Sequence, residues 1–209
     1  MDVITDIRKE RGRYRVTVSE SDEFLVPVSL MRERPLQTGQ PLDVEEYDNW
    51  LMLRQYRHAL ERAVAYLAAR ARSRREVEQK LLQAGYRPCT VEMVLYKLER
   101  ENILDDADFA RQWVEARSGR KLGRSRIAQE LRRKGVAQDE AEAALEAIDD
   151  DDQLSAAVAL AEKAAARVKP GEEPRKSASR IHAMLARRGF SWDIAKEAVR
   201  RAMGDDDEL

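Results

Sequence analysis

The chain of 209 residues is short of the residue types on which most catalytic and metal sites depend. It holds a single cysteine, Cys89, which excludes an intrachain disulfide. Its two histidines, His58 and His182, are far apart in sequence, and the cysteine and histidine spacings of zinc sites are missing. There is no glycine-rich phosphate loop, and the acidic runs at 149–152 and 205–208 lack the spacing of a calcium-binding loop. We therefore expect a binding or structural protein without catalytic residues, metal or cofactor.

Long apolar runs are missing as well. No stretch of about 18 apolar residues occurs and no signal peptide is seen, so we expect a cytoplasmic protein that does not enter a membrane. Cys89 follows Pro88 near a helix start and is expected to be a small buried side chain. His58 and His182 lie on charged helices and are expected at the surface.

Charge is abundant but nearly balanced, because charged residues make up 37% of the chain and the formal net charge is -1. The balance hides alternating blocks. Their net charges are -4 for residues 1–53, +9 for 54–136, -8 for 137–174, +6 for 175–203 and -4 for 204–209. Blocks of this size indicate a protein that meets charged partners, although a solvated helical surface is the plainer alternative.

One stretch organises the rest of the chain: RARSRREVEQKLLQAGY, residues 70–86. Ser73 and Glu76 have the spacing of a capping box, which predicts a helix start. Gly85 stands where a left-handed residue ends a helix, and a Schellman ending there would bring Leu81 into contact with the residue after the glycine. The stretch therefore predicts one complete helix with both ends marked.

The same pattern occurs twice more, in GRSRIAQELRRKGV (123–136) and SASRIHAMLARRGF (177–190). Their glycines, Gly135 and Gly189, follow the preceding copy at spacings of 50 and 54 residues. Apolar or small residues lie at +6, +9, +10 and +13 after each glycine, which predicts a further amphipathic helix, and another apolar helix precedes each copy. The repeating element is therefore helix–helix–turn–helix, as in small solenoids, and its third copy has the smallest core residues.

The amino-terminal residues 3–28 alternate apolar and polar side chains with the period of half-buried strands. The alternation predicts a hairpin with its turn at Ser21–Asp22, and a third strand at Val3–Arg8 with Gly12 in the turn that follows. Pro27 places its strand at a sheet edge or at a strand end. No other strand is expected.

Helical signals fill the remainder. Asp43 marks the start of a helix that we expect to continue to Arg72, with a break near Gln55. Asp105 and the run 149–152 are expected to cap the first helices of the second and third copies.

The predicted fold is mainly α, with three tandem three-helix repeats in an elongated, curved arrangement and a small amino-terminal β-hairpin or three-stranded module. The segment KPGEEP (169–174) is predicted to be a loop inside the third repeat. The predicted boundaries are 1–54 for the β module with a linker helix, 55–103 for repeat 1, 104–150 for repeat 2, 151–203 for repeat 3 and 204–209 for a frayed acidic tail.

Three segments together resemble the RecX family of small bacterial proteins that regulate the RecA recombinase. They are AVAYLAARARSRREVEQKLLQAGY (63–86), LDDADFARQWVEAR (104–117) and GRSRIAQELRRKG (123–135). Their order and spacing carry the resemblance, which covers residues 56–150 strongly and 151–203 weakly.

The resemblance implies a regulator without enzymatic activity or cofactor. Such proteins bind the RecA filament on DNA, lodge in its helical groove, and restrain filament growth, ATP hydrolysis and strand exchange, within DNA repair, recombination and the SOS response. The expected partner is therefore the RecA filament, with single- or double-stranded DNA as an open second partner, and we expect a monomer.

The candidate partner-binding residues are basic and gather where the first helix of a repeat meets the second. We expect their side chains to be exposed. The macrodipole disfavours cations at a helix start, so placing several arginines there suggests, without proving, that they bind a partner. They are Arg70, Arg72, Arg74 and Arg75 in repeat 1, and Arg117, Arg120, Lys121, Arg124 and Arg126 in repeat 2.

The alternative from another class is a protein that binds DNA directly, because helix, glycine turn and helix is the outline of a helix-turn-helix. In repeat 2, however, the helix after the turn reads QDEAEAALEAI and is acidic, which disfavours an approach to phosphates. Nonspecific phosphate contact by the basic residues stays open.

Overall fold

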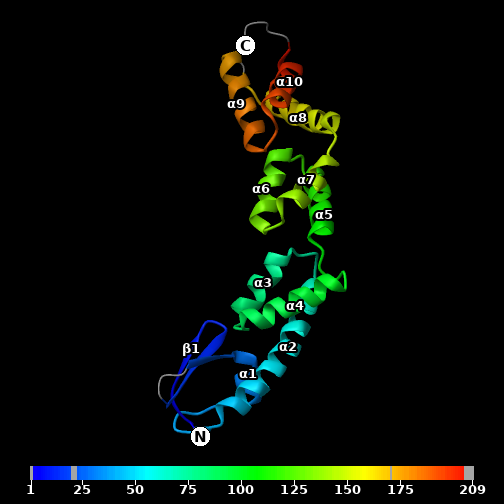
Figure 1. The fold of residues 1–209 in the computed structure, drawn as a ribbon. Coiled ribbons are helices and arrows are strands. Elements are labelled where there is room, and N and C mark those ends of the chain that lie inside the picture. The colour runs from blue at the N-terminus through cyan, green and yellow to red at the C-terminus, as the bar shows by residue number, and fades with distance from the viewer. Residues whose placement is uncertain (1, 20–22, 170, 205–209) are drawn as a thin grey trace. The chain divides into compact units, whose positions relative to one another are not determined.

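The computed structural model describes residues 2–19, 23–169 and 171–204 (Figure 1). Within these residues the chain forms four strands and ten α-helices, so the prediction of a mainly α fold is confirmed. The strands are β1 (Asp2–Glu10), β2 (Arg13–Val18), β3 (Glu23–Pro27) and β4 (Pro41–Leu42). The helices are α1 (Val28–Glu33), α2 (Val44–Ala68), α3 (Arg74–Gln83), α4 (Pro88–Arg100), α5 (Asp106–Ser118), α6 (Arg124–Lys134), α7 (Gln138–Glu146), α8 (Asp150–Ala165), α9 (Pro174–Arg187) and α10 (Trp192–Met203).

The strands form one antiparallel sheet in the order β3-β2-β1-β4. β1 and β2 are joined around Gly12, which has a φ of +81°, and β3 is an edge strand that ends at Pro27. Both features agree with the sequence prediction. The predicted turn at Ser21–Asp22 lies outside the described residues.

Two details of this module were predicted wrongly. β4 pairs with β1 at Asp2 and Val3, so the sheet has four strands and is not confined to residues 3–28. A two-residue strand is too short to show an alternating pattern. The predicted strand alternation included Val28, but this residue is the first of α1. Pro27, whose ring fixes φ, ends β3 and directly precedes the helix.

The sheet packs on the first half of α2 through one apolar cluster. It includes Ile4, Val16 and Val26 from the strands with Tyr47 and Leu51 from α2, all at most 1% exposed. Apolar side chains at alternate strand positions share a face, so the strands bury these residues and turn their charged neighbours outward.

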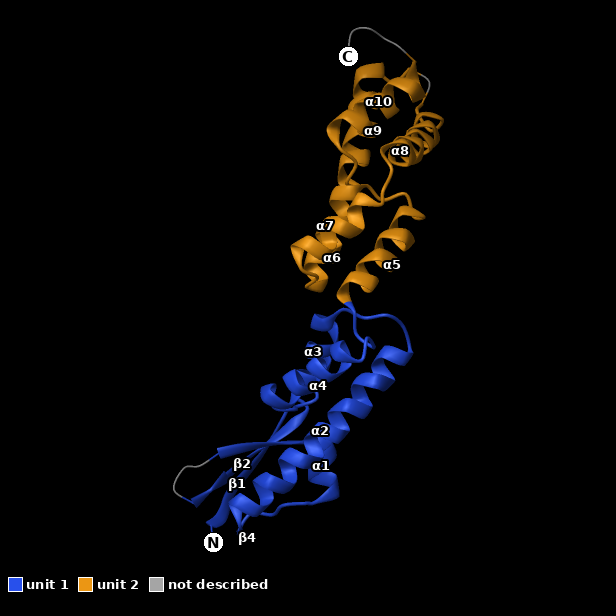
Figure 2. Ribbon diagram, turned by 45° about the vertical axis from the view of Figure 1, so that its right-hand side comes forward, with its two compact units in different colours: residues 1–105 blue, residues 106–209 orange. Residues whose placement is uncertain are grey.

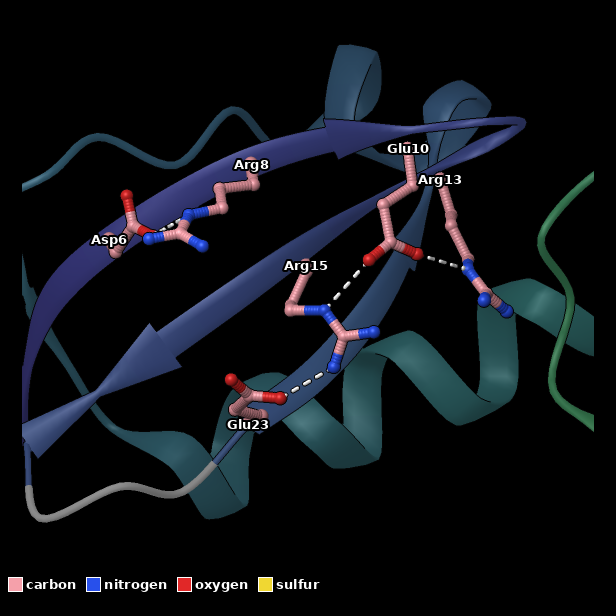
Figure 3. Close-up of polar contacts among 6 residues, drawn as sticks. All are labelled: Asp6, Arg8, Glu10, Arg13, Arg15 and Glu23. Atoms are coloured by element: carbon pink, nitrogen blue, oxygen red, sulfur yellow. Dashed lines mark hydrogen bonds and ion pairs between the residues drawn. The ribbon is translucent and has the colours of Figure 1, made fainter.

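The opposite face of the sheet carries a cross-strand network of charges (Figure 3). Arg15 lies between two carboxylates, with Nε 2.7 Å from Glu10 and Nη1 2.6 Å from Glu23. Arg13 binds the other oxygen of Glu10 at 3.0 Å. Hydrogen bonds from Arg15 and then Arg13 lower the pKa of Glu10. Because these charges compensate one another, this face is a poor candidate for a charged partner.

Helix α2 begins as predicted, because the Asp43 side chain accepts a hydrogen bond from the Glu46 amide. The predicted break near Gln55 is wrong, since α2 is continuous for 25 residues, and the helix ends at Ala68 rather than at Arg72. Gln55 is fully buried, and its Oε1 accepts a hydrogen bond from the Arg87 amide at 3.0 Å. A polar residue in the apolar stripe therefore marks a contact with the start of α4.

The helix ending predicted for each repeat is confirmed in all three. Gly85, Gly135 and Gly189 have φ values of +92°, +81° and +90°. The amide that follows each glycine donates to the carbonyl five residues earlier, at 3.4, 3.3 and 3.3 Å. This is the Schellman pattern, and the capping box at Ser73 and Glu76 is also present.

Each repeat has its own apolar cluster among the described residues. Leu81, Leu131 and Leu185 are fully buried at equivalent positions. The helix after each glycine buries most of the expected residues: Val91, Val94, Leu95 and Leu98, then Ala141, Ala144 and Leu145, then Ala195, Ala198 and Val199, with Ala202 half-buried. Ile148 is buried too, but it lies just beyond the end of α7. Repeat 3 buries five alanines in its cluster, so its core has the smallest side chains, as predicted.

The connections agree with most predictions. α5 starts directly after Asp105, and the Asp149 side chain accepts from the Asp151 amide at the start of α8. The predicted loop 169–174 lies between α8 and α9 in its described residues, except that Pro174 already begins α9. The tail beyond Gly204 lies outside the described residues. Cys89 is exposed, which corrects the expectation of a buried thiol.

Both histidines are half-buried, which corrects the expectation of surface residues. His58 Nε2 lies 2.6 Å from Glu33 of α1. His182 packs its ring against Trp192 with centroids 6.1 Å apart.

The chain divides into two compact units, residues 1–105 and 106–209 (Figure 2). The first unit holds the β module and repeat 1, and the second holds repeats 2 and 3. α2 runs without interruption across residues 54 and 55. The repeat boundaries and the elongated, curved arrangement stay predictions.

Within each unit a pair of glycines allows two backbones to touch. In the first unit, a Cβ on Gly12 would lie 2.1 Å from the carbonyl oxygen of Gln83, and one on Gly85 would lie 2.5 Å from the Gly12 oxygen. The turn between β1 and β2 therefore rests on the carboxyl end of α3.

In the second unit the start of α6 meets the carboxyl end of α9. The Gly123 amide donates to the Arg188 carbonyl at 2.9 Å, and the Ser125 amide donates to the Gly189 carbonyl at 3.1 Å. Free donors at one helix start thus satisfy free acceptors at another helix end. Because a Cβ on Gly123 would lie 2.1 Å from the Gly189 carbonyl carbon, this joint requires glycine.

Candidate partner-binding surface

Two of the predicted cations in repeat 1 are held by carboxylates of the same repeat. Arg70 Nη2 lies 3.0 Å from Glu76, the capping residue of α3. Arg74 bridges to α4, with Nε 2.7 Å from Glu99 and Nη2 2.6 Å from Glu92. Burial opposes the charged form of Arg74, but attraction to Glu99 and Glu92 outweighs it and raises the pKa of the guanidinium. The expectation of an exposed side chain is therefore wrong for Arg74, which is half-buried, and right for Arg70. It is wrong as well for Arg72, Arg117 and Arg126, which are also half-buried.

Arg72 is half-buried because it stacks on an aromatic ring of α2. Its guanidinium carbon lies 4.0 Å from the centre of the Tyr66 ring, and Lys80 lies 5.3 Å from the same ring. A cation over a ring face is attracted by the ring's quadrupole. The Tyr66 ring of α2 thus contacts both the loop that follows, through Arg72, and α3, through Lys80.

Repeat 2 contains a second arrangement of this kind. Arg117 lies 4.0 Å above the Trp113 ring, and its Nε donates to Glu130 at 2.6 Å. The Trp113 Nε1 donates to the same carboxylate at 3.1 Å, and Arg126 approaches it at 3.6 Å. Lys134 of α6 also lies close to this ring, with its Nζ 4.5 Å from the centre of the Trp113 ring. Trp113 and Arg117 therefore hold α5 against α6 through Glu130, whereas Arg126 pairs with Glu130 within α6.

Arg124 connects α6 to the end of α7. Its Nη2 lies 2.6 Å from the Ile148 carbonyl oxygen and 3.1 Å from Asp150, and its amide donates to Gln153 at 3.0 Å. The buried Gln153 of α8 thus accepts a backbone amide at the start of another helix, as Gln55 does at the start of α4. The unfavourable macrodipole at Arg74 and Arg124 is offset inside the protein, so those placements do not by themselves indicate a partner.

Three predicted cations remain available. Arg75, Arg120 and Lys121 are exposed, and their side chains make no hydrogen bond or ion pair with the described residues. Lys121 also has a φ of +55°, which is uncommon for a residue with a Cβ. Arg75 lies in the first unit and the other two in the second, so the structure describes two separate groups of free charge.

We expect Arg117→Gln to lower the free energy of unfolding by about 1–3 kcal/mol, because it removes the nearest charged donor of Glu130, at 2.6 Å, and leaves only the longer contact with Arg126 at 3.6 Å among its charged partners in the described residues. Glu130 has a side chain only 18% exposed, so water replaces the lost contact poorly. Urea denaturation measures the change, with Arg120→Gln as the matched control from the same junction. Equal stability of the two variants would show that the stacked pair is not structural.

Sequence reasoning missed the two aromatic and arginine stacks. A signal exists for one of them, since Trp113 and Arg117 lie four residues apart on α5 and so share a helix face. Arg72 lies beyond the end of α2 at Ala68, so helix periodicity does not relate it to Tyr66. It also missed the split of the nine cations into held and free members, because ion pairing depends on which carboxylates of another helix come within reach.

The helix after the turn in repeat 2 does not suit DNA recognition. α7 exposes Asp139, Glu142 and Glu146 and carries no basic residue. A helix that enters a groove must approach phosphates, so the structure supports the argument against a helix-turn-helix role for this repeat.

Known proteins give the same architecture. Sequence models of three RecX domains match in order: the first three-helix domain at residues 59–98, the second at 105–145 and the third at 150–199. A curated "Regulatory protein RecX" of Mycobacteroides abscessus is 32% identical over 88% of this chain and 85% of its own length. This chain belongs to the RecX family. Another RecX regulatory protein, from Prosthecochloris aestuarii, is 40% identical over 68% of this chain and 92% of that protein.

Solved RecX structures share the fold. One crystal structure of a regulatory protein RecX is 26% identical and aligns over 93% of this chain and 97% of its own, with a TM-score of 0.65. RecX from Lactobacillus salivarius is 27% identical over 72% of this chain and 97% of its own, with a TM-score of 0.67. This RecX-family chain is therefore a member of a family of regulatory proteins.

No helix among the described residues has the length and apolar character needed to cross a membrane. Within the same residues, no group of three or more His, Cys, Asp and Glu side chains is placed to hold a metal ion.

Proposed function

We propose that this RecX-family protein regulates RecA by binding its filament on DNA, and that it restrains filament growth, ATP hydrolysis and strand exchange. It acts in the cytoplasm as a monomer without cofactor or catalysis. The observation that supports this most directly is the ordered set of three RecX domains along the chain. A RecA filament exposes protein carboxylates and DNA phosphates, and both attract arginine.

Arg75, Arg120 and Lys121 are the residues that we propose to contact the filament. They belong to the block of residues 54–136, which has a net charge of +9. The other cations of the two junctions are engaged within their own repeats, so reversing them would disturb the fold as well as the surface. The free residues allow binding to be tested separately from stability.

The test is the triple variant Arg75→Glu, Arg120→Glu and Lys121→Glu. Wild-type protein should inhibit DNA-dependent ATP hydrolysis by RecA, and the variant should lose that inhibition. Its circular dichroism and melting temperature should stay close to wild type, because surface substitutions away from structural contacts change stability by about 0.5 kcal/mol or less.

A matched control reverses Arg62, Arg100 and Arg187. These are also exposed and unpaired among the described residues, but they lie outside the first-to-second helix junctions. The control should inhibit as wild type does. If the triple variant inhibits at wild-type concentrations, these three residues are only a solvated face and do not contact the filament.

A salt series separates the two kinds of contact. Neutralising a phosphate gives a log–log slope of about -0.9 per duplex phosphate and about -0.7 on a single strand. A triple variant that binds more weakly with an unchanged slope would assign the three side chains to carboxylates of RecA. Full binding to bare DNA at the same salt, without preference for the RecA filament, would instead favour the nonspecific DNA-binding function.

A further inference from the structure

A concave surface in repeat 3 gathers positive charge that the proposed function does not use. It lies between α8, α9 and the loop that joins them, and has a volume of about 550 Å³. Leu160, Ala164 and Met184 form its apolar floor. The cations that line it are Lys163, Arg167, Lys169, Arg180 and Arg188. We call it the α8–α9 groove.

The sequence makes this concentration unusual. Residues 137–174 form the most acidic block of the chain, with a net charge of -8, and contain only three basic residues. Those three are Lys163, Arg167 and Lys169, and all three line the α8–α9 groove. The fold therefore turns the few cations of an acidic segment toward the arginines of α9.

The groove contains little to neutralise these charges. Glu172 is the one carboxylate in its lining, and both of its oxygens face Arg180, at 2.5 and 3.4 Å. Arg188 is partly engaged, since it donates to the Lys121 carbonyl at 3.5 Å. Lys163, Arg167 and Lys169 are exposed and make no side-chain hydrogen bond or ion pair with the described residues. Like charges held close together repel, so an anionic ligand would be favourable here.

Cations on neighbouring surfaces, in contrast, are compensated by carboxylates. Elsewhere in repeat 3, Arg200 and then Arg201 donate to Glu197 and lower its pKa to about 2, so those cations are compensated. A second groove in the same unit, of about 740 Å³ between α5, α7 and α8, mixes two cations with three carboxylates. The α8–α9 groove is thus basic, whereas this second groove has mixed charge.

We propose that the α8–α9 groove binds phosphate groups of a single-stranded nucleic acid backbone. Proteins that bind single strands without sequence preference use a positively charged groove that follows the backbone. A single backbone can enter a groove of this size, whereas a double helix presents a wide convex surface. Lys163, Arg167 and Lys169 supply the phosphate contacts, and Arg180 is held in place by Glu172 at the wall.

The experiment measures anisotropy of a fluorescein-labelled oligothymidylate with the full chain, in the absence of RecA. The variant of the α8–α9 groove, called the pocket variant below, combines Lys163→Gln, Arg167→Gln and Lys169→Gln. It keeps Arg180 and Arg188, the two arginines with protein partners. We expect its affinity at low salt to fall by about tenfold or more. Its log–log salt slope should become less steep by about 2, which corresponds to three phosphate contacts at about 0.7 each.

The matched control is Lys176→Gln, Arg187→Gln and Arg201→Gln, which removes the same charge from exposed positions of the same repeat outside the groove. It should keep its affinity within about twofold and its slope nearly unchanged. Circular dichroism confirms that each variant folds. A double variant, Lys163→Gln with Arg167→Gln, confines the change to α8 and its neighbourhood if the triple variant is unstable.

Inorganic pyrophosphate supplies the second arm. If it raises the melting temperature of wild type but not of the pocket variant, while both bind the oligothymidylate equally, the ligand is a free phosphate compound and the nucleic acid proposal is wrong. Equal loss of affinity in the pocket and control variants would also overturn it, because net charge alone would then explain binding. Since RecA is absent from these measurements, neither result bears on filament regulation.

Discussion

Leu81→Ala should lower the free energy of unfolding by about 2–5 kcal/mol, whereas Leu82→Ala should lower it by less than about 1 kcal/mol. The two leucines are adjacent on α3, but Leu81 is fully buried and Leu82 is 38% exposed. Leu81 packs in the cluster of repeat 1, where truncation removes apolar contacts and leaves a cavity. Urea denaturation of the two variants measures the difference, with the neighbouring leucine as an internal control of the same chemistry.

Hydrogen exchange then shows how far the damage spreads. The apolar clusters of repeats 1 and 2 have no residue in common among the described residues, and α2 joins repeat 1 to the β module. We therefore expect Leu81→Ala to reduce protection in α2–α4 and in the sheet, and to leave α5–α7 protected. Leu131→Ala should reduce protection in α5–α7 first. A uniform loss across all helices in either variant would mean that the chain unfolds as one cooperative core, against the solenoid expectation.

Gly123→Ala should open the joint between repeats 2 and 3 and cost about 1–3 kcal/mol or more. Gly123 has φ -76° and ψ 155°, a conformation open to any residue, so backbone strain plays no part. The added Cβ would lie 2.1 Å from the Gly189 carbonyl carbon, and real contacts of this kind do not occur. The two hydrogen bonds to the Arg188 and Gly189 carbonyls would lengthen or break.

Gly119→Ala is the matched control, because it lies four residues earlier and its added Cβ would meet nothing closer than the Glu115 carbonyl at 3.6 Å. It should be neutral or slightly stabilising, since alanine restricts the unfolded chain. Amide exchange at Ser125 reports the joint directly, because its donor is bound to Gly189. Normal protection at Ser125 in Gly123→Ala, together with wild-type stability, would show that the close approach is relieved by a small shift and matters little.

The sequence was most informative where structure depends on near neighbours. The glycine endings, the capping box at Ser73 and the cap at Asp43 are short-range devices, and each appears as predicted. Periodicity located the buried face of the helices after each glycine for the same reason. β4 escaped detection because a two-residue strand exists only through its pairing with β1.

The candidate site was predicted less completely, since its chemistry depends on distant partners. The sequence predicted basic residues at both helix junctions. It did not predict which carboxylates of other helices would form ion pairs with them. Arg74 is held by Glu99 from α4, and Arg117 by Glu130 from α6. The sequence predicted a helix break near Gln55, and it gave no sign of the hydrogen bond that this side chain makes to the Arg87 amide, 32 residues away. The α8–α9 groove was hidden for a similar reason, because its cations come from segments of opposite average charge.

The separate cluster inside each repeat bears on how the protein is made. Every cluster of a repeat draws its residues from a short, continuous segment, so closing it requires only short loops. During synthesis, repeat 1 can complete its core before the ribosome has translated repeat 3, and domains that emerge first can fold first. The nascent chain then exposes little apolar surface at any moment. A chain interrupted after repeat 2 would carry one finished joint, at Gly12 and Gly85, and would leave the donors at the start of α6 facing water.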